Sequence, residues 1–301
     1  MNKGPDILNW LPASRKEMDL RGWEEADVIL VSGDAYVDHP SFGPAVIGRL
    51  LLDQGYRVGL VAQPDWKNPE ALKVMGRPNI ACGVTAGNMD SMVCLYTAGR
   101  RLRKEDCYSP AGRTGLKPPH ATVVYSQLAK AAFPGIPVVL GGVEASLRRV
   151  AHYDYWQDKM RPSVLVDSKA EILVYGMGEH AAKEIFKRLR EGKELDGIKG
   201  TARLLGGKAS AELKIDEHFI ELPSFEEMQA DKMALMRETI AVESEMNPWS
   251  GRRFIQRYGQ RILLVEPPAE PLSPSEFDHV SELNYAWMPH PSYKELIPAF
   301  E

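Results

Sequence analysis

Apolar residues follow one repeating pattern over the first two thirds of the chain: short continuous runs alternate with stretches of helical spacing. The runs are residues 28–31, 57–62, 79–84, 136–140 and 170–175. Continuous apolar runs of this kind are typical of strands that are buried on both faces of a parallel sheet. Helical spacing predicts helices between them, at 41–55, 68–75, 121–133, 144–150 and 180–190. The pattern therefore predicts a doubly wound α/β fold.

Five strands alternating with helices favour an open parallel sheet that is covered by helices on both faces. We expect the flavodoxin-like strand order 2-1-3-4-5, in which each number gives the position of a strand along the chain. On this basis residues 26–197 form a Rossmann-like α/β domain, and residues 1–25 form an N-terminal extension that precedes it.

The last hundred residues have a different pattern, which predicts an α+β C-terminal extension. Residues 202–205 and 218–222 predict a small hairpin. Ser224 and Glu227 have the spacing of a capping box, which predicts a long helix running to about Met246. Hairpin and helix make up a predicted segment, 198–262. Residues 263–301 are expected to form a proline-rich exit segment, because four prolines within 266–274 exclude a helix or a central strand.

Composition narrows the class of protein. The chain has 301 residues, with 37 Lys and Arg against 41 Asp and Glu, and its formal net charge of −4 gives no reason to expect general nucleic-acid binding. Its three cysteines, Cys82, Cys94 and Cys107, have the spacing of neither a zinc site nor a disulfide framework. No segment is apolar enough to span a membrane, and the N-terminus lacks the features of a signal peptide. We therefore expect a cytoplasmic protein.

Glycines follow several of the predicted strands. Ligands of open α/β sheets bind outside the carboxyl ends of the strands, where glycine lets a ligand approach the backbone and helix N-termini favour anions. We therefore expect a ligand or interdomain crevice there, lined by Gly43, Gly141, Gly142, Gly176, Gly178 and Glu179. The alternative is that these glycines only form tight turns. Residues 176–181 match the dinucleotide fingerprint G-x-G-x-x-A, but they follow the last strand, which argues against NAD.

Asp34, Asp38 and His39 lie in the loop after the first strand and belong to the same predicted crevice. Cobalamin-binding domains carry a D-x-H-x-x-G motif with an axial histidine at this place. The register here differs, because Asp38 directly precedes His39 and Gly43 follows four residues later, so we expect no axial histidine. A hydrogen-bonded loop is favoured over a metal site, and we predict no metal site in this chain.

The densest set of polar and aromatic residues lies directly after the fourth strand. Its candidate site residues are Glu144, Arg148, Arg149, His152, Tyr153 and Asp154. Arginines bind carboxylates or phosphates through paired hydrogen bonds, and neighbouring aromatic rings can stack on a base. The alternative, given equal weight, is a salt-bridged surface between domains with aromatic packing.

Several strings resemble those of the YgiQ-type (UPF0313) radical SAM proteins, over about residues 11–301. The most specific are GGVEASLRR at 141–149 and HYDYWQ at 152–157, and others lie at 174–179, 221–226, 266–269 and 289–293. The resemblance implies the N-terminal domain of such a protein, with a cobalamin-binding-like fold. In the family a catalytic barrel follows, in which three cysteines bind a 4Fe–4S cluster and the fourth iron binds S-adenosylmethionine.

This sequence ends at Glu301, where the resemblance implies that the cluster motif would follow, and none of its cysteines belongs to that motif. We therefore predict no catalytic residue and no bound cofactor in this chain, while the cluster and S-adenosylmethionine are implied for the full-length protein. The leading hypothesis is an accessory domain, inactive alone, that partners the barrel in cis on an unknown small-molecule or macromolecular substrate. The alternatives are a stand-alone module that binds a cobalamin-like or nucleotide ligand, and an interdomain surface at 148–156 alone.

Overall fold

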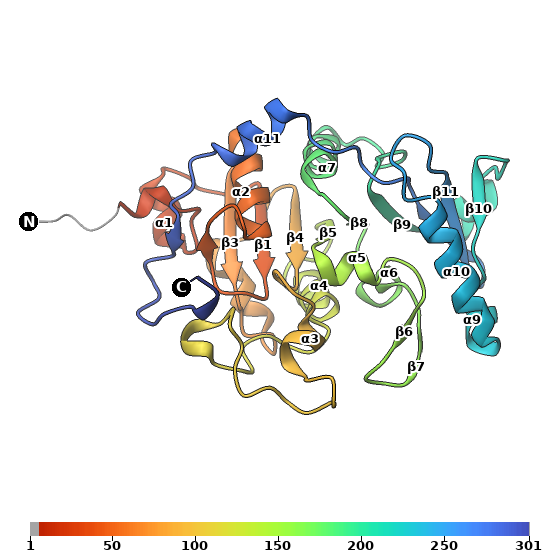
Figure 1. Cartoon of the computed structure of the whole chain (residues 1–301). Helices are drawn as coiled ribbons and strands as arrows, with labels where there is room; N and C mark the ends of the chain where they lie inside the picture. Colours follow the sequence, from red (N-terminus) through yellow and green to blue (C-terminus); the bar gives the residue numbers. More distant parts are fainter. Residues whose placement is uncertain (1–5, 301) are drawn as a thin grey trace, which may run out of the picture.

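The computed structural model describes residues 6–300 (Figure 1). Within them, the largest sheet has nine strands in the order β10-β11-β12-β9-β8-β5-β4-β1-β3. These strands are β1 (Val28–Ser32), β3 (Val58–Ala62), β4 (Ala81–Thr85), β5 (Val138–Gly141), β8 (Ile172–Val174), β9 (Thr201–Leu205), β10 (Phe219–Glu221), β11 (Arg253–Tyr258) and β12 (Arg261–Val265). Two small sheets pair β2 (Val37–Asp38) with β13 (Met288–Pro289) and β6 (His152–Asp154) with β7 (Lys159–Arg161).

Strands β3, β1, β4, β5 and β8 run parallel to one another and form one half of the large sheet. Val28 of β1 is level with Val58 of β3 on one side and with Ala81 of β4 on the other. Numbered along the chain, the five strands have the order 2-1-3-4-5, so the predicted flavodoxin-like topology is confirmed.

Strands β9 to β12 continue the same sheet, mainly in antiparallel pairing. β9 lies between β8 and β12, and β11 and β12 form a hairpin closed by Gly259 and Gln260. The predicted hairpin of 202–205 with 218–222 is therefore wrong. Both edges of β9 are already paired, and β10 instead runs parallel to β11 at the edge of the sheet. The division of the chain into four segments stays a prediction.

Helices cover both faces of the parallel half. On one face, α2 (Gly43–Asp53) and α7 (Glu179–Glu191) share a core with Leu30 of β1. On the other face, η2 (Pro69–Met75), α4 (Ala121–Ala132) and α6 (Val164–Ser168) pack together and share a core with Ile29. Ile29 and Leu30 are neighbours that serve opposite faces, because side chains alternate along a strand.

The expected long helix after Ser224 is two helices, α9 (Phe225–Ala230) and α10 (Lys232–Ser244). The capping box of Ser224 and Glu227 is present. Asp231 interrupts the helix, because its backbone is extended and its carboxylate accepts a hydrogen bond from the Met233 backbone N–H, which caps a second helix. Both helices lie at the end of the sheet away from β1 and β3 (Figure 1).

The C-terminal part of the chain returns to the first strands. Helix α11 (Pro274–Ser281) bridges α2 and α7: His279 Nε2 lies 3.1 Å from Asp53 Oδ2, and His180 Nε2 lies 2.9 Å from Glu276 Oε1. Strand β13 then pairs with β2. The loop that follows β1 is therefore held by residues from the far end of the sequence.

The remaining helical segments are short. They are η1 (Ile7–Asn9), α1 (Arg15–Leu20), α3 (Ser91–Leu95), η3 (Pro110–Gly112), α5 (Val143–Leu147), α8 (Gly207–Glu212) and η4 (Pro298–Phe300). Among residues 6–300, no helix has both the length and the apolar character needed to cross a bilayer.

Candidate functional site

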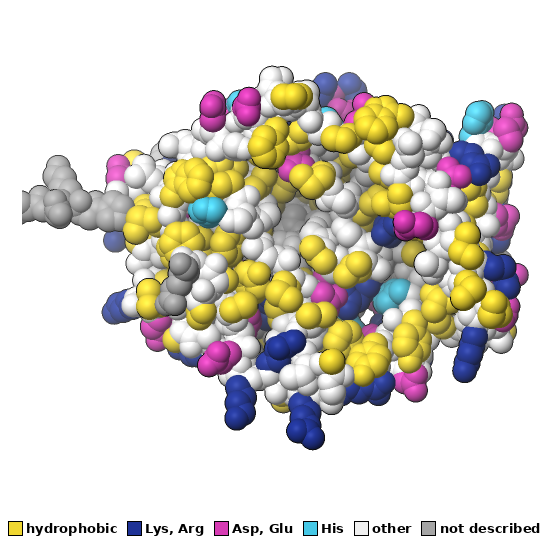
Figure 2. Space-filling view, in the orientation of Figure 1, with side chains coloured by type: hydrophobic (Ala, Val, Ile, Leu, Met, Phe, Trp, Pro, Cys, Tyr) yellow, Lys and Arg dark blue, Asp and Glu magenta, His cyan; other side chains and the backbone are white. Residues whose placement is uncertain are grey.

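A cavity of about 530 Å³ lies over β4 and β5, between α2 and α7. It exists because of the strand order. Helices α2 and α7 follow β1 and β8 and pack on the same face, while the helices that follow β4 and β5 contribute to the core of the opposite face. The middle of this face therefore has no helix of its own, as expected at a topological switch point. Figure 2 shows a hollow near the middle of the molecule, bordered by hydrophobic side chains.

Six residues of the predicted crevice line this cavity. They are Gly43, Gly141, Gly142, Gly176, Gly178 and Glu179. Aliphatic side chains from the sheet and from α2 complete the walls, among them Leu30, Val139 and Ile47. The walls are thus mostly backbone and hydrocarbon, which is typical of small-molecule sites of this size.

The glycine after β5 is required by the backbone and by its neighbours. Gly142 has φ +86°, in the left-handed region that favours glycine, and a Cβ added there would lie 2.4 Å from Thr85 Oγ1. Gly87, in the next loop of the cavity wall, has φ +105°, and a Cβ there would lie within 2.4 Å of the Asp34 carboxylate. Both glycines are therefore explained by the fold itself, in agreement with the tight-turn alternative.

Glu179 is the one charged residue among the described residues that line the cavity. It is the first residue of α7 and is 8% exposed. Its Oε2 atom is buried and has no hydrogen-bond partner within residues 6–300. Buried carboxylate oxygens normally accept hydrogen bonds, because leaving one unpaired costs free energy.

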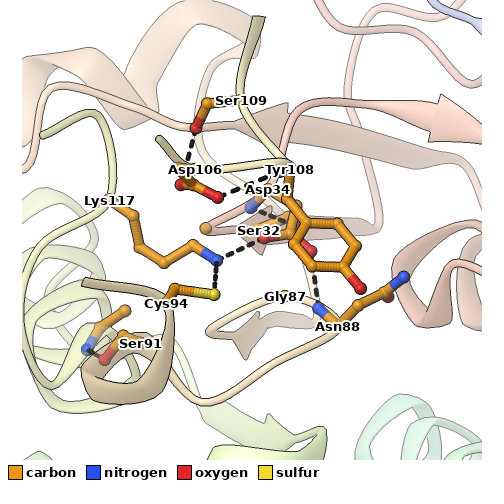
Figure 3. Close-up of polar contacts among 12 residues, drawn as sticks. Ser32, Asp34, Gly87, Asn88, Ser91, Cys94, Asp106, Tyr108, Ser109 and Lys117 are labelled. Atoms are coloured by element: carbon orange, nitrogen blue, oxygen red, sulfur yellow. Dashed lines mark hydrogen bonds and ion pairs between the residues drawn. The ribbon is translucent and has the colours of Figure 1, made fainter. Parts of the chain in front are cut away.

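A buried ion pair lies beside the cavity wall, at the end of β1 (Figure 3). The Lys117 ammonium donates to Asp34 Oδ1, and both side chains are at most 1% exposed. Lys117 Nζ also lies 3.5 Å from Cys94 Sγ, and the Asn88 backbone N–H donates to Asp34 Oδ2 at 2.6 Å. Burial alone would lower the pKa of Lys117, but the Asp34 carboxylate outweighs it and raises that pKa, so Lys117 is protonated.

Lys117 was missed by the sequence analysis because it lies in a long loop far from any strand end. One signal was available: its neighbours are Leu116, Pro118 and Pro119, which are poor candidates for a solvated loop. Cys94 is a buried free thiol, and its burial raises its pKa to about 11.

Asp34, Asp38 and His39 have separate partners and do not line the cavity. Asp38 is fully buried and pairs with Arg49 of α2, whose Nε lies 3.1 Å from its Oδ1. Asp38 Oδ2 also accepts a hydrogen bond from the Ala286 backbone N–H at 2.7 Å. His39 Nδ1 is hydrogen-bonded to Ser41. The loop is therefore held by structural hydrogen bonds, and residues 6–300 contain no group of three metal-ligating side chains.

The polar segment after β5 also makes internal contacts. Glu144 is 1% exposed and accepts hydrogen bonds from the backbone N–H groups of Ser91, at 2.7 Å, and Thr122, at 2.9 Å. It thereby caps the first turns of both α3 and α4. Arg148 donates to Asp90, the N-cap residue of α3.

The rest of this segment lies away from the cavity. The Arg149 guanidinium stacks over the ring of Tyr175, with its Cζ 4.7 Å from the ring centroid. Burial lowers the pKa of His152 to about 4. Asp154 accepts a hydrogen bond from the Gln157 backbone N–H at 2.8 Å. Tyr153 is exposed and donates to Asp158. These contacts favour the structural alternative for most of the segment.

The parallel sheet, its order and the cavity at its switch point define a doubly wound α/β domain. A family model described as radical SAM N-terminal matches residues 10–301, and the chain belongs to that family. The resemblance expected from the sequence is thereby confirmed.

A UPF0313 protein of Bradyrhizobium diazoefficiens is 49% identical to this chain, and the match covers 97% of this chain and 46% of the relative. A UPF0313 protein of Porphyromonas gingivalis is 45% identical, and the match covers 100% of this chain and 48% of the relative. The chain thus spans about half the length of the curated relatives it matches. Among solved structures, the radical S-adenosylmethionine methyltransferase TsrM of Kitasatospora setae matches 58% of this chain and 28% of its own, with 21% identity and a TM-score of 0.40. A second TsrM structure, with cobalamin and a 4Fe–4S cluster bound, matches with a TM-score of 0.40 and 19% identity.

Proposed function

We propose that this chain is the accessory N-terminal domain of a radical SAM enzyme, and that it holds a small-molecule ligand for a catalytic barrel that follows it in cis. Family membership supports the general role, and the length of the relatives supports a further domain. The observation that carries the ligand-binding part is the cavity of about 530 Å³ at the switch point, whose walls are mostly backbone and aliphatic side chains.

A 4Fe–4S cluster, which the family implies, does not fit the cysteines of this chain. Cys82 lies in the core under α4, and burial raises its pKa to about 12. Burial also raises the pKa of Cys94, whose sulfur faces Lys117. Cluster ligands are thiolates, and burial in apolar surroundings disfavours thiolates. We therefore assign the cluster, and the S-adenosylmethionine that it binds and cleaves, to the proposed barrel.

Exposed apolar side chains near the mouth of the cavity support the docking of that barrel. Val143 and Met177, which line the mouth, are 47% and 61% exposed, and Leu147, one turn along α5, is 62% exposed. A clustered apolar rim of this kind is typical of a surface that another domain covers. A barrel seated on it would face the ligand held in the cavity.

Anaerobic reconstitution with iron and sulfide tests the proposal. We compare this chain with the longer chain that includes the sequence following it in the gene. The longer chain is expected to gain iron and the broad visible absorbance of a cluster, and residues 1–301 alone are not. The matched control is the longer chain with Cys82, Cys94 and Cys107 all changed to Ser, which is expected to keep its cluster. A cluster on the short chain, or none on the long chain, overturns the proposal.

The second candidate is a module that binds a cobalamin-like or nucleotide ligand on its own. The cavity itself favours this candidate. Because no Lys or Arg is found among the described lining residues, a nucleotide phosphate would depend on the backbone N–H groups at the N-termini of α2 and α7. Calorimetric titration of residues 1–301 with cobalamin and with AMP tests the two forms: tight binding of either ligand supports the independent module, and binding of neither contradicts it.

A further inference from the structure

The loop that follows α3 carries a cluster of positive charge at residues 97–105, which we call the basic loop. Its four cations are all exposed: Arg100, Arg101, Arg103 and Lys104. Within residues 6–300 none of the four forms an ion pair with a carboxylate, and Glu105 is the one exposed carboxylate of the loop. The whole chain has a formal net charge of −4, so the basic loop is a local exception. Figure 2 shows Lys and Arg side chains along the lower edge of the molecule, where this loop lies in Figure 1.

The basic loop is fastened to the hairpin of β6 and β7. The hydroxyl of Tyr155, which directly follows β6, donates a hydrogen bond to the Ala98 carbonyl oxygen at 2.8 Å. The Arg100 guanidinium lies over the ring of Tyr155, with its Cζ 4.5 Å from the ring centroid. Arg100 has φ +57°, a left-handed conformation that costs free energy for a residue with a side chain. These contacts hold the guanidinium on the aromatic ring in spite of that cost.

Two tyrosine rings are exposed beside the cations. Tyr153 and Tyr155 are 45% and 44% exposed. The hydrogen bond to Asp158 raises the pKa of Tyr153, and the charge of Arg100 opposes this rise, which places the guanidinium near both rings. Trp156 packs edge-on against Tyr155, with ring centroids 5.6 Å apart, and supports that ring from behind the surface. The basic loop and the hairpin therefore form one surface that combines positive charge with aromatic faces.

We propose that this surface binds a single-stranded nucleic acid, with phosphates on the cations of the basic loop and unstacked bases on the tyrosine rings. The inference goes beyond the proposed function and does not depend on the cavity. Lysine and arginine neutralise phosphates, and aromatic rings stack on bases with little regard to sequence. A guanidinium that lies on a ring presents its N–H groups edgewise, in the geometry that suits a phosphate.

The aromatic rings decide between nucleic acid and another polyanion. An acidic protein segment would pair with the cations but would leave the faces of Tyr153 and Tyr155 unused. A duplex would offer phosphates too, but its bases are stacked on one another and cannot reach a ring. A flexible strand with exposed bases uses both parts of the surface.

Binding is tested by fluorescence anisotropy of a labelled uridine oligonucleotide of about 12 residues with residues 1–301. With three to four phosphate contacts on a single strand, we expect Kd to rise about 20- to 50-fold between about 50 and 200 mM salt. A thymidine oligonucleotide of the same length tests the sugar, and binding of either strand supports the inference. The uridine strand annealed to oligoadenosine, and an oligoglutamate of equal length, are expected to bind more weakly. No binding of either single strand at the lower salt, or equal binding of the duplex or the oligoglutamate, overturns the inference.

Two charge variants locate the phosphate contacts. Arg101→Ala combined with Lys104→Ala is expected to weaken binding at least about tenfold and to reduce the salt dependence by one to two phosphate contacts. Lys208→Ala combined with Lys214→Ala makes the same change of charge at exposed positions in another part of the chain, and is expected to leave Kd within about twofold. Equal loss in the two double variants would show that only net charge matters, which overturns the inference.

Variants of one exposed ring test the stacking. Tyr153→Ala is expected to weaken binding at least about fivefold, whereas Tyr153→Phe keeps the ring and is expected to keep the affinity. Unchanged binding of Tyr153→Ala overturns the assignment of bases to the rings and, with it, the inference. Filling the cavity with Gly141→Val should leave binding of the strand unchanged, because Gly141 lies outside this surface. Failure of nucleic-acid binding therefore leaves the proposed function of the cavity untouched.

Discussion

The cavity and the polar network beside it, formed by Asp34, Lys117, Glu144 and Arg148, lie at the same edge of the sheet and differ in the side chains that build them. In the network, the Asp34–Lys117 pair is buried, and Glu144 and Arg148 bind the ends of helices. The cavity has walls of glycine backbone and aliphatic side chains, and Glu179 is the one charged residue among its described lining residues. The comparison teaches that a high density of reactive residue types can serve the fold alone, whereas a pocket for a ligand can be built with few of them.

The largest expected effect on stability is at the buried Asp34–Lys117 ion pair of the polar network. Lys117→Met leaves the Asp34 carboxylate buried and uncompensated, and we expect it to lower the free energy of unfolding by about 3–5 kcal/mol. Urea denaturation followed by circular dichroism measures this loss. Exposed Lys104 provides the control, since Lys104→Met should change stability by no more than about 0.5 kcal/mol. A loss below about 1 kcal/mol for Lys117→Met would show that the pair does not stabilise the fold.

A smaller loss of stability is expected where a substitution keeps one of the two acceptor oxygens of a buried carboxylate. Glu144→Gln keeps one acceptor oxygen for the two backbone N–H groups of Ser91 and Thr122, so one of them loses its partner. We expect a loss of about 1–3 kcal/mol by the same measurement. Glu243→Gln, at an exposed position of α10, is the matched control. Equal stability of the two variants would mean that Glu144 is free to bind something else.

The pH dependence of stability tests the burial of His152 in the network segment. Its pKa is lowered by burial to about 4, so the unfolded chain takes up the proton first as the pH falls. The stabilisation is complete above about pH 6.5 and is lost between that pH and about pH 4. We expect wild type to lose about 2 kcal/mol more than His152→Gln between pH 7 and pH 5. Parallel pH profiles for the two proteins would contradict the burial argument.

The smallest effect on stability is expected in the cavity. Gly141→Val has room and a strand backbone, so the free energy of unfolding should change by no more than about 0.5 kcal/mol. The neighbouring Gly142→Ala must adopt φ +86° and displace Thr85, and a loss of about 1–3 kcal/mol is expected. Thermal unfolding compares the two. If Gly141→Val proves the more costly, the space over β5 is filled in solution and the contrast between cavity and network disappears.

The sequence predicted the parallel half of the fold because its strands are continuous apolar runs with glycine at their ends, as at Gly141. The antiparallel half was not predicted, because the pairing of β9 with β12 joins segments about sixty residues apart and leaves no local signal. The break at Asp231 depends on a choice between continuing a helix and capping a new one, which tertiary packing decides. At the site, Gly176 and Glu179 were found from their place after a strand, whereas Lys117 and the unpaired Glu179 oxygen depend on contacts that only the folded chain forms.

The return of the C-terminal part to the first β-α loop has a consequence for how the protein is made. Asp38 obtains the Ala286 backbone N–H, its partner 248 residues later, only after most of the chain has been translated. At about 5–20 residues per second, a ribosome needs roughly 10–50 s to cover that distance. For that time the nascent strands β1 and β3 can pair, but the loop beside them waits without its final hydrogen bonds. The domain can therefore complete this loop only after residue 286 has been made, and chains stalled or shortened before that residue should be recognised by proteases through this loop.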